Sequence, residues 1–327
     1  MQRVAVVGAG TMGRTHANAY AKMPNAELVA ICDLQIEVAD QLAESLSTPA
    51  TFPSLKKLLA EAEVDVVDVC VPTNVHLEVI KEAAAAEKHI CSEKPLARTT
   101  GQAMEAVRVC EEAGVTLFVA QVLRWFPEFR KLHDLIKSGA VGDATVVRTS
   151  RCGTPPGRWF GDFKQSGGVI LDLIIHDFDW LRWCFGKVKR VYARGLLEAG
   201  IAGTDYALVT LRHESGVISH VEGSWARPSG FAVSVEVAGT NGLLSFSSKD
   251  STPLTIECRA KDGAEVGVIV PESPTSVDPY YQELDHFINC LEEGRTPDVT
   301  AEDGLEAVRI CEAAMRSVST RRPVALA

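Results

Sequence analysis

The chain has 327 residues, of which 46% are hydrophobic and 23% charged, a balance that excludes disordered and collagen-like proteins. Acidic side chains outnumber basic ones, 43 against 33, and the resulting net charge of −10 repels nucleic-acid phosphates. No apolar run reaches the roughly 18–20 residues that a bilayer-spanning helix needs. We therefore expect no nucleic-acid or membrane partner, and about two domains.

The cysteine pattern bears on redox environment and metal binding. The nine cysteines form no CxxC pair, and most lie in apolar runs such as Val69-Cys70-Val71. Buried, reduced thiols explain this pattern better than a disulfide framework or a zinc site. The apolar stretch at residues 4–7 is also too short for a secretion signal. We expect a cytoplasmic protein that binds no metal.

The first 120 residues alternate short β-branched runs with longer Ala-, Glu- and Lys-rich stretches of helical spacing. Strands that are apolar on both faces and separated by helices predict a parallel sheet covered on both sides. The sequence thus predicts an α/β Rossmann domain over residues 1–121. The strands are expected at residues 4–7, 28–32, 64–71, 89–91 and 116–119, and helices at residues 78–88 and 101–113.

After a predicted helix at residues 127–138, alternating strands dominate. Residues 206–212 and 217–225 are joined by a turn, and Asn241-Gly242 is a strong hairpin signal. Residues 122–327 are therefore expected to form an α+β domain with an open, mainly antiparallel β-sheet, for substrate binding and oligomerisation. Because few helices cover the sheet's second face, we expect a homo-oligomer, a tetramer or a dimer.

Two helices are predicted to close the chain. They cover residues 280–293 and 301–319, and the second is a candidate to pack back on the first domain.

A GxGxxG motif stands between the first predicted strand and a helix. Gly8 permits the tight turn, Gly10 lets the backbone approach a pyrophosphate, and Gly13 allows close packing of helix on strand. Thr11 and Met12 open the helix, whose amide groups and dipole favour phosphate. In this context the motif predicts dinucleotide binding better than an empty tight turn.

Asp33 follows Gly13 by 20 residues and ends the second predicted strand. A carboxylate there accepts hydrogen bonds from ribose hydroxyls but repels a 2′-phosphate. Residues 34–36 offer no Arg or Lys to hold such a phosphate. The sequence therefore favours NAD over NADP, and Asp33 can at the same time cap the following helix.

Two segments carry candidate catalytic groups. Lys94 follows the predicted strand at residues 89–91, at the end where open α/β sheets bind ligands, although a charged turn explains the position about as well. Asp172 and His176 stand four apart in an apolar run, so on one helix they would share a face. In that position Asp172 could orient His176 as a general base, or the two could form a buried hydrogen-bonded pair with no catalytic role. We expect the neighbouring Asp177 and Asp179 to be surface charges or caps.

The whole chain resembles the glucose–fructose oxidoreductase, inositol dehydrogenase and rhizopine catabolism (Gfo/Idh/MocA) family. The resemblance rests on four motifs in order: Gly8-x-Gly10-x-x-Gly13, Val71-Pro72-Thr73-Asn74-Val75-His76, Glu93-Lys94-Pro95, and Gly167-Gly168-x-x-x-Asp172-x-x-x-His176-Asp177. It implies that Glu93 binds the nicotinamide ribose and that Lys94 lies between ribose and substrate. It further implies that His176 takes a hydroxyl proton, that Asp172 orients it, and that a hydride passes to NAD.

The loop chemistry and the resemblance together define a predicted site. The cofactor set is Gly8, Gly10, Thr11, Met12, Gly13, Asp33, Pro72, Thr73, Asn74, His76, Glu93, Lys94 and Gln121. The substrate set is Lys94, Arg124, Arg158, Trp159, Asp172 and His176. Interdomain packing accounts equally well for Arg124 and for the loop of Arg158 and Trp159. Convergence of Arg124, Arg158 or Lys164 on one cleft would favour an acidic or phosphorylated sugar, and without it a neutral polyol is expected.

The function predicted from this resemblance is NAD-dependent oxidation of a secondary hydroxyl on a cyclic polyol or sugar, with an inositol-like substrate. A non-catalytic NAD-binding sensor is one alternative, disfavoured by the intact Lys94, Asp172 and His176. An enzyme that cleaves glycosides with a tightly held NAD is another.

Overall fold

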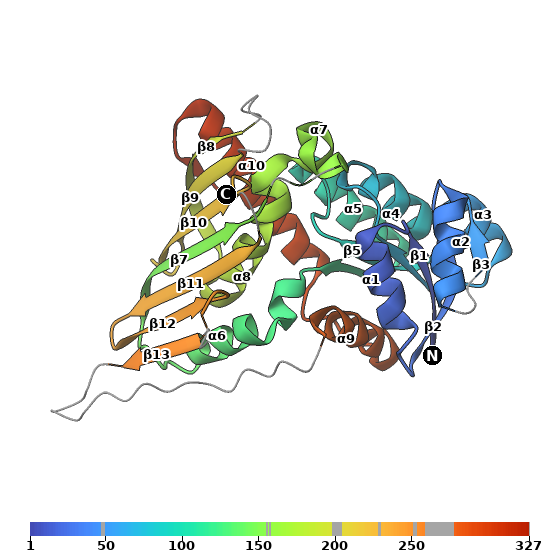
Figure 1. Cartoon of the computed structure of the whole chain (residues 1–327), viewed down its shortest axis with the longest axis horizontal. Coiled ribbons are helices and arrows are strands. Elements are labelled where there is room, and N and C mark those ends of the chain that lie inside the picture. The colour runs from blue at the N-terminus through green and yellow to red at the C-terminus, as the bar shows by residue number, and fades with distance from the viewer. Residues whose placement is uncertain are drawn as a thin grey trace. The chain divides into compact units, whose positions relative to one another are not determined.

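The computed structural model divides into two compact units (Figure 1). The first contains Met1–Trp125 and Val277–Val308, and the second Phe126–Ser276 and Arg309–Ala327. The prediction from sequence assigned everything after residue 121 to a second domain, so Val277–Val308 lies in a different unit from the one expected. No helix among the described residues is both long and apolar enough to cross a membrane. The structure describes residues 1–46, 50–154, 156, 158–197, 205–227, 230–250, 254–258 and 278–326.

Six parallel strands form the sheet of the first unit, in the order β3-β2-β1-β4-β5-β6. The chain winds outward from β1 in both directions, which confirms the predicted Rossmann sheet. The three-residue β3 was not singled out, because three residues are too few to show a pattern. The strands are β1 (Gln2–Val7), β2 (Ala26–Cys32), β3 (Ala50–Phe52), β4 (Val66–Val69), β5 (His89–Glu93) and β6 (Leu117–Ala120).

Helices of the first unit pack in pairs, α1 against α9 and α4 against α5. Helix α9 joins this unit through its apolar face, where Phe287 stacks on Phe118 of β6 with ring centroids 5.0 Å apart. Asp278 caps its first turn and Gly294, in the left-handed region, ends it. The helices are α1 (Thr11–Tyr20), α2 (Ile36–Ser45), α3 (Leu55–Glu61), α4 (His76–Ala85), α5 (Thr100–Ala113) and α9 (Pro279–Glu293).

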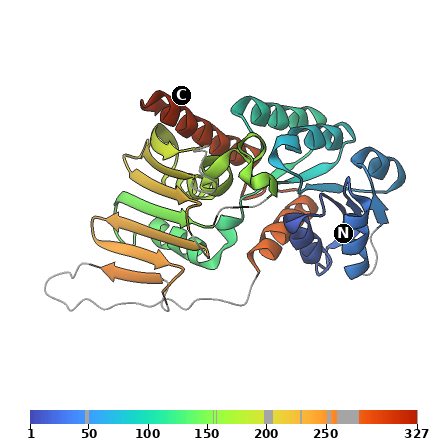
Figure 2. The ribbon, with the colours of Figure 1, turned by 45° about the horizontal axis from the view of Figure 1, so that its top comes forward.

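Eight strands form the sheet of the second unit, in the order β13-β12-β11-β7-β10-β9-β8-β14 (Figure 2). The predicted hairpins are present, because β9 pairs with β10 and β11 with β12 in antiparallel fashion. One pair, β7 with β10, is parallel, because β7 inserts between two strands that are consecutive in the chain. The strands are β7 (Ala144–Cys152), β8 (Val188–Leu196), β9 (Tyr206–His213), β10 (Ile218–Ser224), β11 (Ala232–Gly239), β12 (Gly242–Ser247), β13 (Leu254–Cys258) and β14 (Val324–Ala325).

One face of this second sheet is packed and the other is polar. Phe129 of α6 (Pro127–Lys137) lies edge-on to Trp180 of α8 (Ile175–Phe185), 5.6 Å between centroids, and to Phe246 of β12, 5.5 Å. On the opposite face, alternate residues such as Arg148 and His220 are half-buried or exposed. The last long helix, α10 (Ala301–Thr320), contributes residues to both units.

The cysteines are mostly buried. Eight of the nine have described side chains, and none of these eight is in a disulfide bond. Burial raises the pKa of the Cys32 and Cys110 thiols to about 12, so both are protonated at neutral pH. They act as small apolar side chains rather than as nucleophiles.

An ion pair ties the start of β1 to the segment before β4. Arg3 donates from its backbone N and its Nε to Asp65 Oδ2, at 2.9 and 3.0 Å, and from Nη2 to Oδ1 at 2.8 Å. The hydrogen bond from Arg3 lowers the pKa of Asp65 to about 2. Arg3 also contacts the more exposed Glu63.

We expect Asp65→Asn to lower the free energy of unfolding by about 1 kcal/mol at pH 7, since the pair is partly exposed. Because the folded-state pKa is lowered, the stabilisation is present above the unfolded value near 3.9 and is lost as the pH falls towards about 2. Urea unfolding of variant and parent at pH 7 and pH 3 measures this. Glu63→Gln is the control and should have a smaller effect. If the difference in unfolding free energy between Asp65→Asn and the parent is as large at pH 3 as at pH 7, the stabilising role of ionised Asp65 is contradicted.

Candidate functional site

The glycine turn after β1 shows two kinds of glycine. Gly8 has a φ of +99°, and a Cβ there would lie 2.5 Å from the carbonyl oxygen of Cys70. A Cβ on Gly13 would lie 1.7 Å from the carbonyl oxygen of Gly8. Gly10, in contrast, has nothing within 4 Å of its Cβ position. Gly8 and Gly13 are therefore required by packing, whereas Gly10 leaves open the space that an approaching phosphate would occupy.

Helix α1 begins directly after this turn. Gly10 occupies its N-cap position without a side chain to cap it, and its first turn carries no acidic residue. Thr11 is exposed and Met12 half-buried. The N-terminal amide groups and the positive end of the helix dipole fit an anion.

Asp33 lies beside the same turn. Its Oδ2 accepts a hydrogen bond from Ala9 N at 2.8 Å, and its Oδ1 accepts one from Gln35 N at 2.9 Å. The carboxylate is thereby fixed between the glycine turn and the end of β2, where each oxygen keeps a further lone pair. This geometry fits an acceptor of ribose hydroxyls.

The loop after β4 is held by His76. Its Nδ1 lies 2.8 Å from the carbonyl oxygen of Pro95, and its Nε2 lies 2.8 Å from that of Val71. Burial lowers the pKa of His76, although both carbonyls oppose this shift. The imidazole thus joins the loop after β4 to the segment after β5 and is engaged within the protein. Pro72 is half-buried and Asn74 exposed in the same loop.

Two predicted cofactor residues have buried polar atoms with unmet hydrogen-bonding capacity. Thr73 is 2% exposed and Gln121, directly after β6, is 0% exposed. Thr73 Oγ1 and both amide atoms of Gln121 lack a hydrogen-bond partner among the described residues. An unmet buried polar group is costly, so a ligand that supplies the missing partners would stabilise this site. Together with the open position at Gly10, these atoms fit a bound dinucleotide.

Glu93 ends β5 as a buried carboxylate, 7% exposed. Its Oε2 accepts a hydrogen bond from Lys94 N at 2.9 Å, and its Oε1 lies 3.3 Å from His16 Nε2. Burial alone would raise the pKa of Glu93, but the contact with His16 and the charge of Lys94 lower it. Glu93 is therefore ionised. The half-buried Lys94 precedes a cis peptide bond to Pro95.

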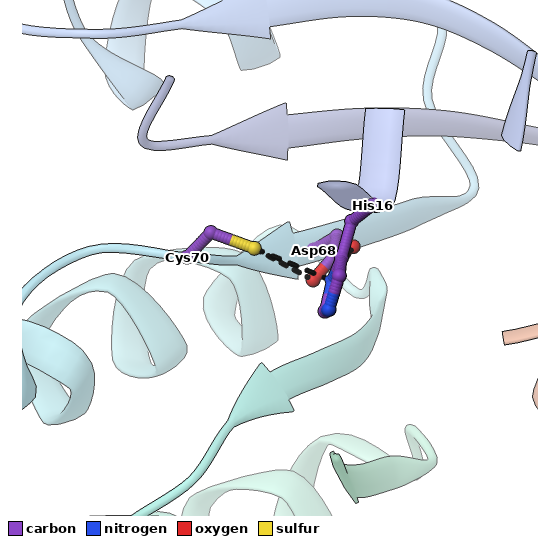
Figure 3. A group of neighbouring side chains, drawn as sticks. All are labelled: His16, Asp68 and Cys70. Atoms are coloured by element: carbon purple, nitrogen blue, oxygen red, sulfur yellow. Dashed lines mark hydrogen bonds and ion pairs between the residues drawn. The ribbon is translucent and has the colours of Figure 1, made fainter. Parts of the chain in front are cut away.

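A buried cluster of His16, Asp68 and Cys70 was missed by the sequence analysis (Figure 3). His16 Nδ1 lies 2.8 Å from Asp68 Oδ2 and 3.4 Å from Cys70 Sγ. The available signals were a histidine one turn after Gly13 and an acid within a run of valines. The three atoms lie close enough together to be metal ligands, and within the protein His16 Nδ1 already contacts both Asp68 and Cys70. A hydrogen-bonded network fits better.

Arg124 is engaged inside the first unit. It lies in a short 3-10 helix, η2 (Val122–Trp125), and is 3% exposed. Its Nη1 donates to the carbonyl oxygen of Asp298 at 3.0 Å, and its Nη2 lies 3.4 Å from Asp303 Oδ1. The structure thus gives this predicted substrate ligand an internal role, which holds the segment that leads into α10.

In the second unit, the predicted single helix through Asp172 and His176 is wrong. Asp172 belongs to a π-helical segment, η4 (Val169–Leu173), whereas His176 lies in the first turn of α8. Ile174 separates them with φ −91° and ψ 3°, and it packs closely on β10, where a Cβ on Gly223 would lie 2.5 Å from its Cγ2. The helix is therefore interrupted at a residue that packs on the sheet. Asp172 is buried and His176 half-buried.

The expectation that Asp177 and Asp179 are surface charges is also wrong, because both are 0% exposed. Arg151 of β7 donates from Nε to Asp177 Oδ2 at 2.6 Å, and the guanidinium is itself buried. A buried carboxylate needs such a partner. This ion pair fixes the first turn of α8, which carries His176, to the sheet.

The predicted substrate loop forms a 3-10 helix, η3 (Arg158–Gly161). In it Trp159 stacks on Phe160, with centroids 4.0 Å apart and planes 25° apart, and both rings are half-buried. The side chain of Arg158 lies outside the described part of the chain. Lys164 follows in α7 (Phe163–Ser166). The structure brings the cofactor set together in the first unit, while Trp159, Asp172 and His176 belong to the second.

Both units match known families. Residues 2–121 match the model of an oxidoreductase family with an NAD-binding Rossmann fold, and residues 129–245 match that of the GFO/IDH/MocA C-terminal domain.

Individual relatives match over nearly their full length. Myo-inositol 2-dehydrogenase of Thermotoga maritima is 31% identical, with 99% of this chain and 98% of the relative covered. YrbE of Bacillus subtilis, described as an uncharacterized oxidoreductase, is 31% identical over 98% of this chain and 95% of its own. The crystal structure of GenD2 from gentamicin A biosynthesis in complex with NAD superposes with a TM-score of 0.87 at 28% identity, covering 100% and 96%. The chain is thus an NAD-binding oxidoreductase and belongs to the Gfo/Idh/MocA family.

Proposed function

We propose that this enzyme is a dehydrogenase that oxidises a secondary hydroxyl of a cyclic polyol or sugar, with an inositol-like substrate. The observation that carries the proposal is the pair Glu93 and Lys94 at the carboxyl end of β5. There a fixed, ionised carboxylate stands directly before a half-buried ammonium group. The relative named myo-inositol 2-dehydrogenase supports a polyol as substrate.

The cofactor contacts are part of the proposal. Gly10, Thr11 and Met12 bind the pyrophosphate through backbone amides, and Asp33 accepts hydrogen bonds from the adenosine ribose. Glu93 accepts hydrogen bonds from the nicotinamide ribose. The remaining contacts come from Pro72, Thr73, Asn74, Gln121 and Lys94, with Gly8, Gly13 and His76 shaping the loops.

The chemical roles follow from the functional groups. The imidazole of His176 accepts the proton of the substrate hydroxyl, while the ammonium of Lys94 donates a hydrogen bond to the same oxygen and stabilises its developing negative charge. Asp172 orients His176. NAD, when bound, supplies the acceptor for the hydride that leaves the carbon. Arg158 and Trp159 contact the rest of the substrate, and Arg124 acts on it only through the segments it holds.

We further propose that the polar face of the second sheet is a subunit interface in a homo-oligomer, a tetramer or a dimer. This face contains a hollow of about 530 Å³ lined by charged and aromatic side chains such as Arg148, Tyr206 and Glu222. Because it carries both charge signs and the exposed Leu208, a second copy of the same face can complement it about a twofold axis. The cytoplasmic location stays a prediction from the cysteine pattern.

Gly10→Ala tests the phosphate site. Because nothing lies within 4 Å of the added Cβ, we expect the fold to be retained, with only a small fall in melting temperature from Ala at the N-cap of α1. The methyl group would occupy the path of the pyrophosphate and raise the Kd for NAD about tenfold or more. Calorimetric titration measures this. Gly101→Ala, which adds a methyl at an equally open position of α5, is the matched control, and equal affinities of the two variants would contradict the site.

Lys94→Met tests the chemistry. NADH formation is followed by absorbance with inositols, aldoses and sugar acids, and we expect turnover with a polyol or sugar that falls about 100-fold or more in the variant. Lys81→Met, on the surface of α4, is the control and should keep full activity. If the parent protein binds NAD yet forms no NADH with any of these compounds, the proposed reaction is contradicted and a sensor is favoured.

Sedimentation tests the interface. We expect the parent protein to sediment as a tetramer or dimer at micromolar concentration, and Leu208→Asp to shift it towards monomer by burying a charge in the contact. Met104→Glu, on the exposed face of α5, is the control and should leave the assembly unchanged. A monomeric parent protein would contradict the proposal.

A further inference from the structure

His16 bridges two buried carboxylates that belong to different strands. From α1 its Nδ1 reaches Asp68 of β4 at 2.8 Å, and its Nε2 reaches Glu93 of β5 at 3.3 Å. The side chains of His16 and Asp68 are 0% exposed and that of Glu93 is 9% exposed. One imidazole thus connects the helix of the glycine turn to Asp68 of β4, as Figure 3 shows, and to Glu93 at the end of β5.

This geometry sets the protonation state of the imidazole. A neutral histidine has one N–H, so it could donate to only one of the two carboxylates and would turn a lone pair towards the other. With both N–H groups present, each nitrogen faces an acceptor. The charge of Asp68 and its hydrogen bond raise the pKa of His16 well above the usual value, although burial alone would lower it. His16 is therefore an imidazolium.

Two further neighbours of His16, Cys70 and Tyr280, are uncharged and do not neutralise the imidazolium. Cys70 Sγ lies 3.4 Å from Nδ1, and burial keeps its thiol protonated by raising its pKa. The ring of Tyr280 lies 6.5 Å from the imidazole, and burial raises the pKa of its hydroxyl to about 12, so it is neutral at physiological pH. Asp68 and Glu93 are the charged groups that His16 contacts directly.

We infer that His16 is a positioning residue that holds Glu93 for the nicotinamide ribose, with Asp68 as its anchor. Both oxygens of Glu93 are engaged: Oε2 accepts a hydrogen bond from Lys94 N, and Oε1 lies in an ion pair with His16. Without the contact at Oε1, the buried carboxylate loses the counter-charge in direct contact with it, so it rotates or takes up a proton more readily. The inference rests on the proposed role of Glu93 and extends it to a residue that does not touch the ribose.

Two substitutions separate the two sides of the imidazole. The amide nitrogen of Asn occupies roughly the place of Nδ1, and that of Gln roughly the place of Nε2. His16→Asn therefore keeps a donor towards Asp68 and loses the one towards Glu93, whereas His16→Gln does the reverse. If His16 acts through Glu93, His16→Gln should bind NAD more tightly than His16→Asn.

The ligands NAD and ADP provide a readout that a general loss of structure would not produce. ADP has the adenosine ribose and the pyrophosphate but lacks the nicotinamide ribose, so Glu93 cannot contribute to its binding. We expect His16→Asn to raise the Kd for NAD about tenfold while the Kd for ADP stays within about twofold. Calorimetric titration of both ligands, with melting temperatures recorded for every variant, measures this.

Cys70→Ala is the matched control, because it removes another neighbour of His16 that does not contact Glu93. It should leave both affinities unchanged. The inference is overturned if His16→Asn weakens NAD and ADP equally, leaves both unchanged, or matches His16→Gln. If His16→Asn does not fold, Asp68→Asn replaces it, since removing the anchor's charge should also weaken NAD selectively, and equal weakening of NAD and ADP there overturns the inference.

Glu93→Gln distinguishes failure of this inference from failure of the proposed function. Selective weakening of NAD by Glu93→Gln, without the same effect in the His16 variants, would refute the role of His16 alone. If Glu93→Gln leaves the ratio of the two affinities unchanged, the proposed ribose contact fails, and the inference fails with it.

Discussion

Parallel pairing of β1 with β4, and of β4 with β5, brings three chain turns to one edge of the sheet in the first unit. The turns follow so closely that the glycine turn leaves no room for a Cβ on Gly8 beside the backbone of Cys70. The same edge receives Glu93 from β5 and Gln121 from β6. The proposed contacts from the turns after β1, β4, β5 and β6 depend on this alignment, because the residues involved are tens of positions apart in the chain.

The alignment buries two carboxylates close together, and His16 supplies their counter-charge. Two carboxylates, Asp68 and Glu93, are withdrawn from water within a few residues of a shared edge. Buried charges are tolerated only when they are paired and hydrogen-bonded. The imidazole from α1 pairs with both, so the helix proposed to face the phosphate is tied to the residue proposed to face the nicotinamide ribose. The two proposed contacts thus share one packed element.

In the second unit, too, a buried ion pair holds a helix in place, here the helix that carries His176. The buried pair of Arg151 and Asp177 fixes α8 to β7, and the helix is interrupted just before His176 at Ile174, which packs closely on Gly223. Both contacts hold the first turn of α8 against the sheet. The proposed general base therefore stands on an element held by a charge pair and by close packing, rather than on a loose loop.

Local pattern alone determined much of this protein. The valine-rich strands, the spacing of the glycines and the acid 20 residues later identify the Rossmann sheet and its NAD site, because strand period and turn chemistry depend on neighbouring residues. The hairpin at Asn241-Gly242 was predictable for the same reason. Contacts between segments that are distant in the chain were decided only by the tertiary structure. The place of α9, the parallel pairing of β7 with β10, the break at Ile174 and the bridge made by His16 all depend on which surfaces meet, and spacing along a chain does not encode that.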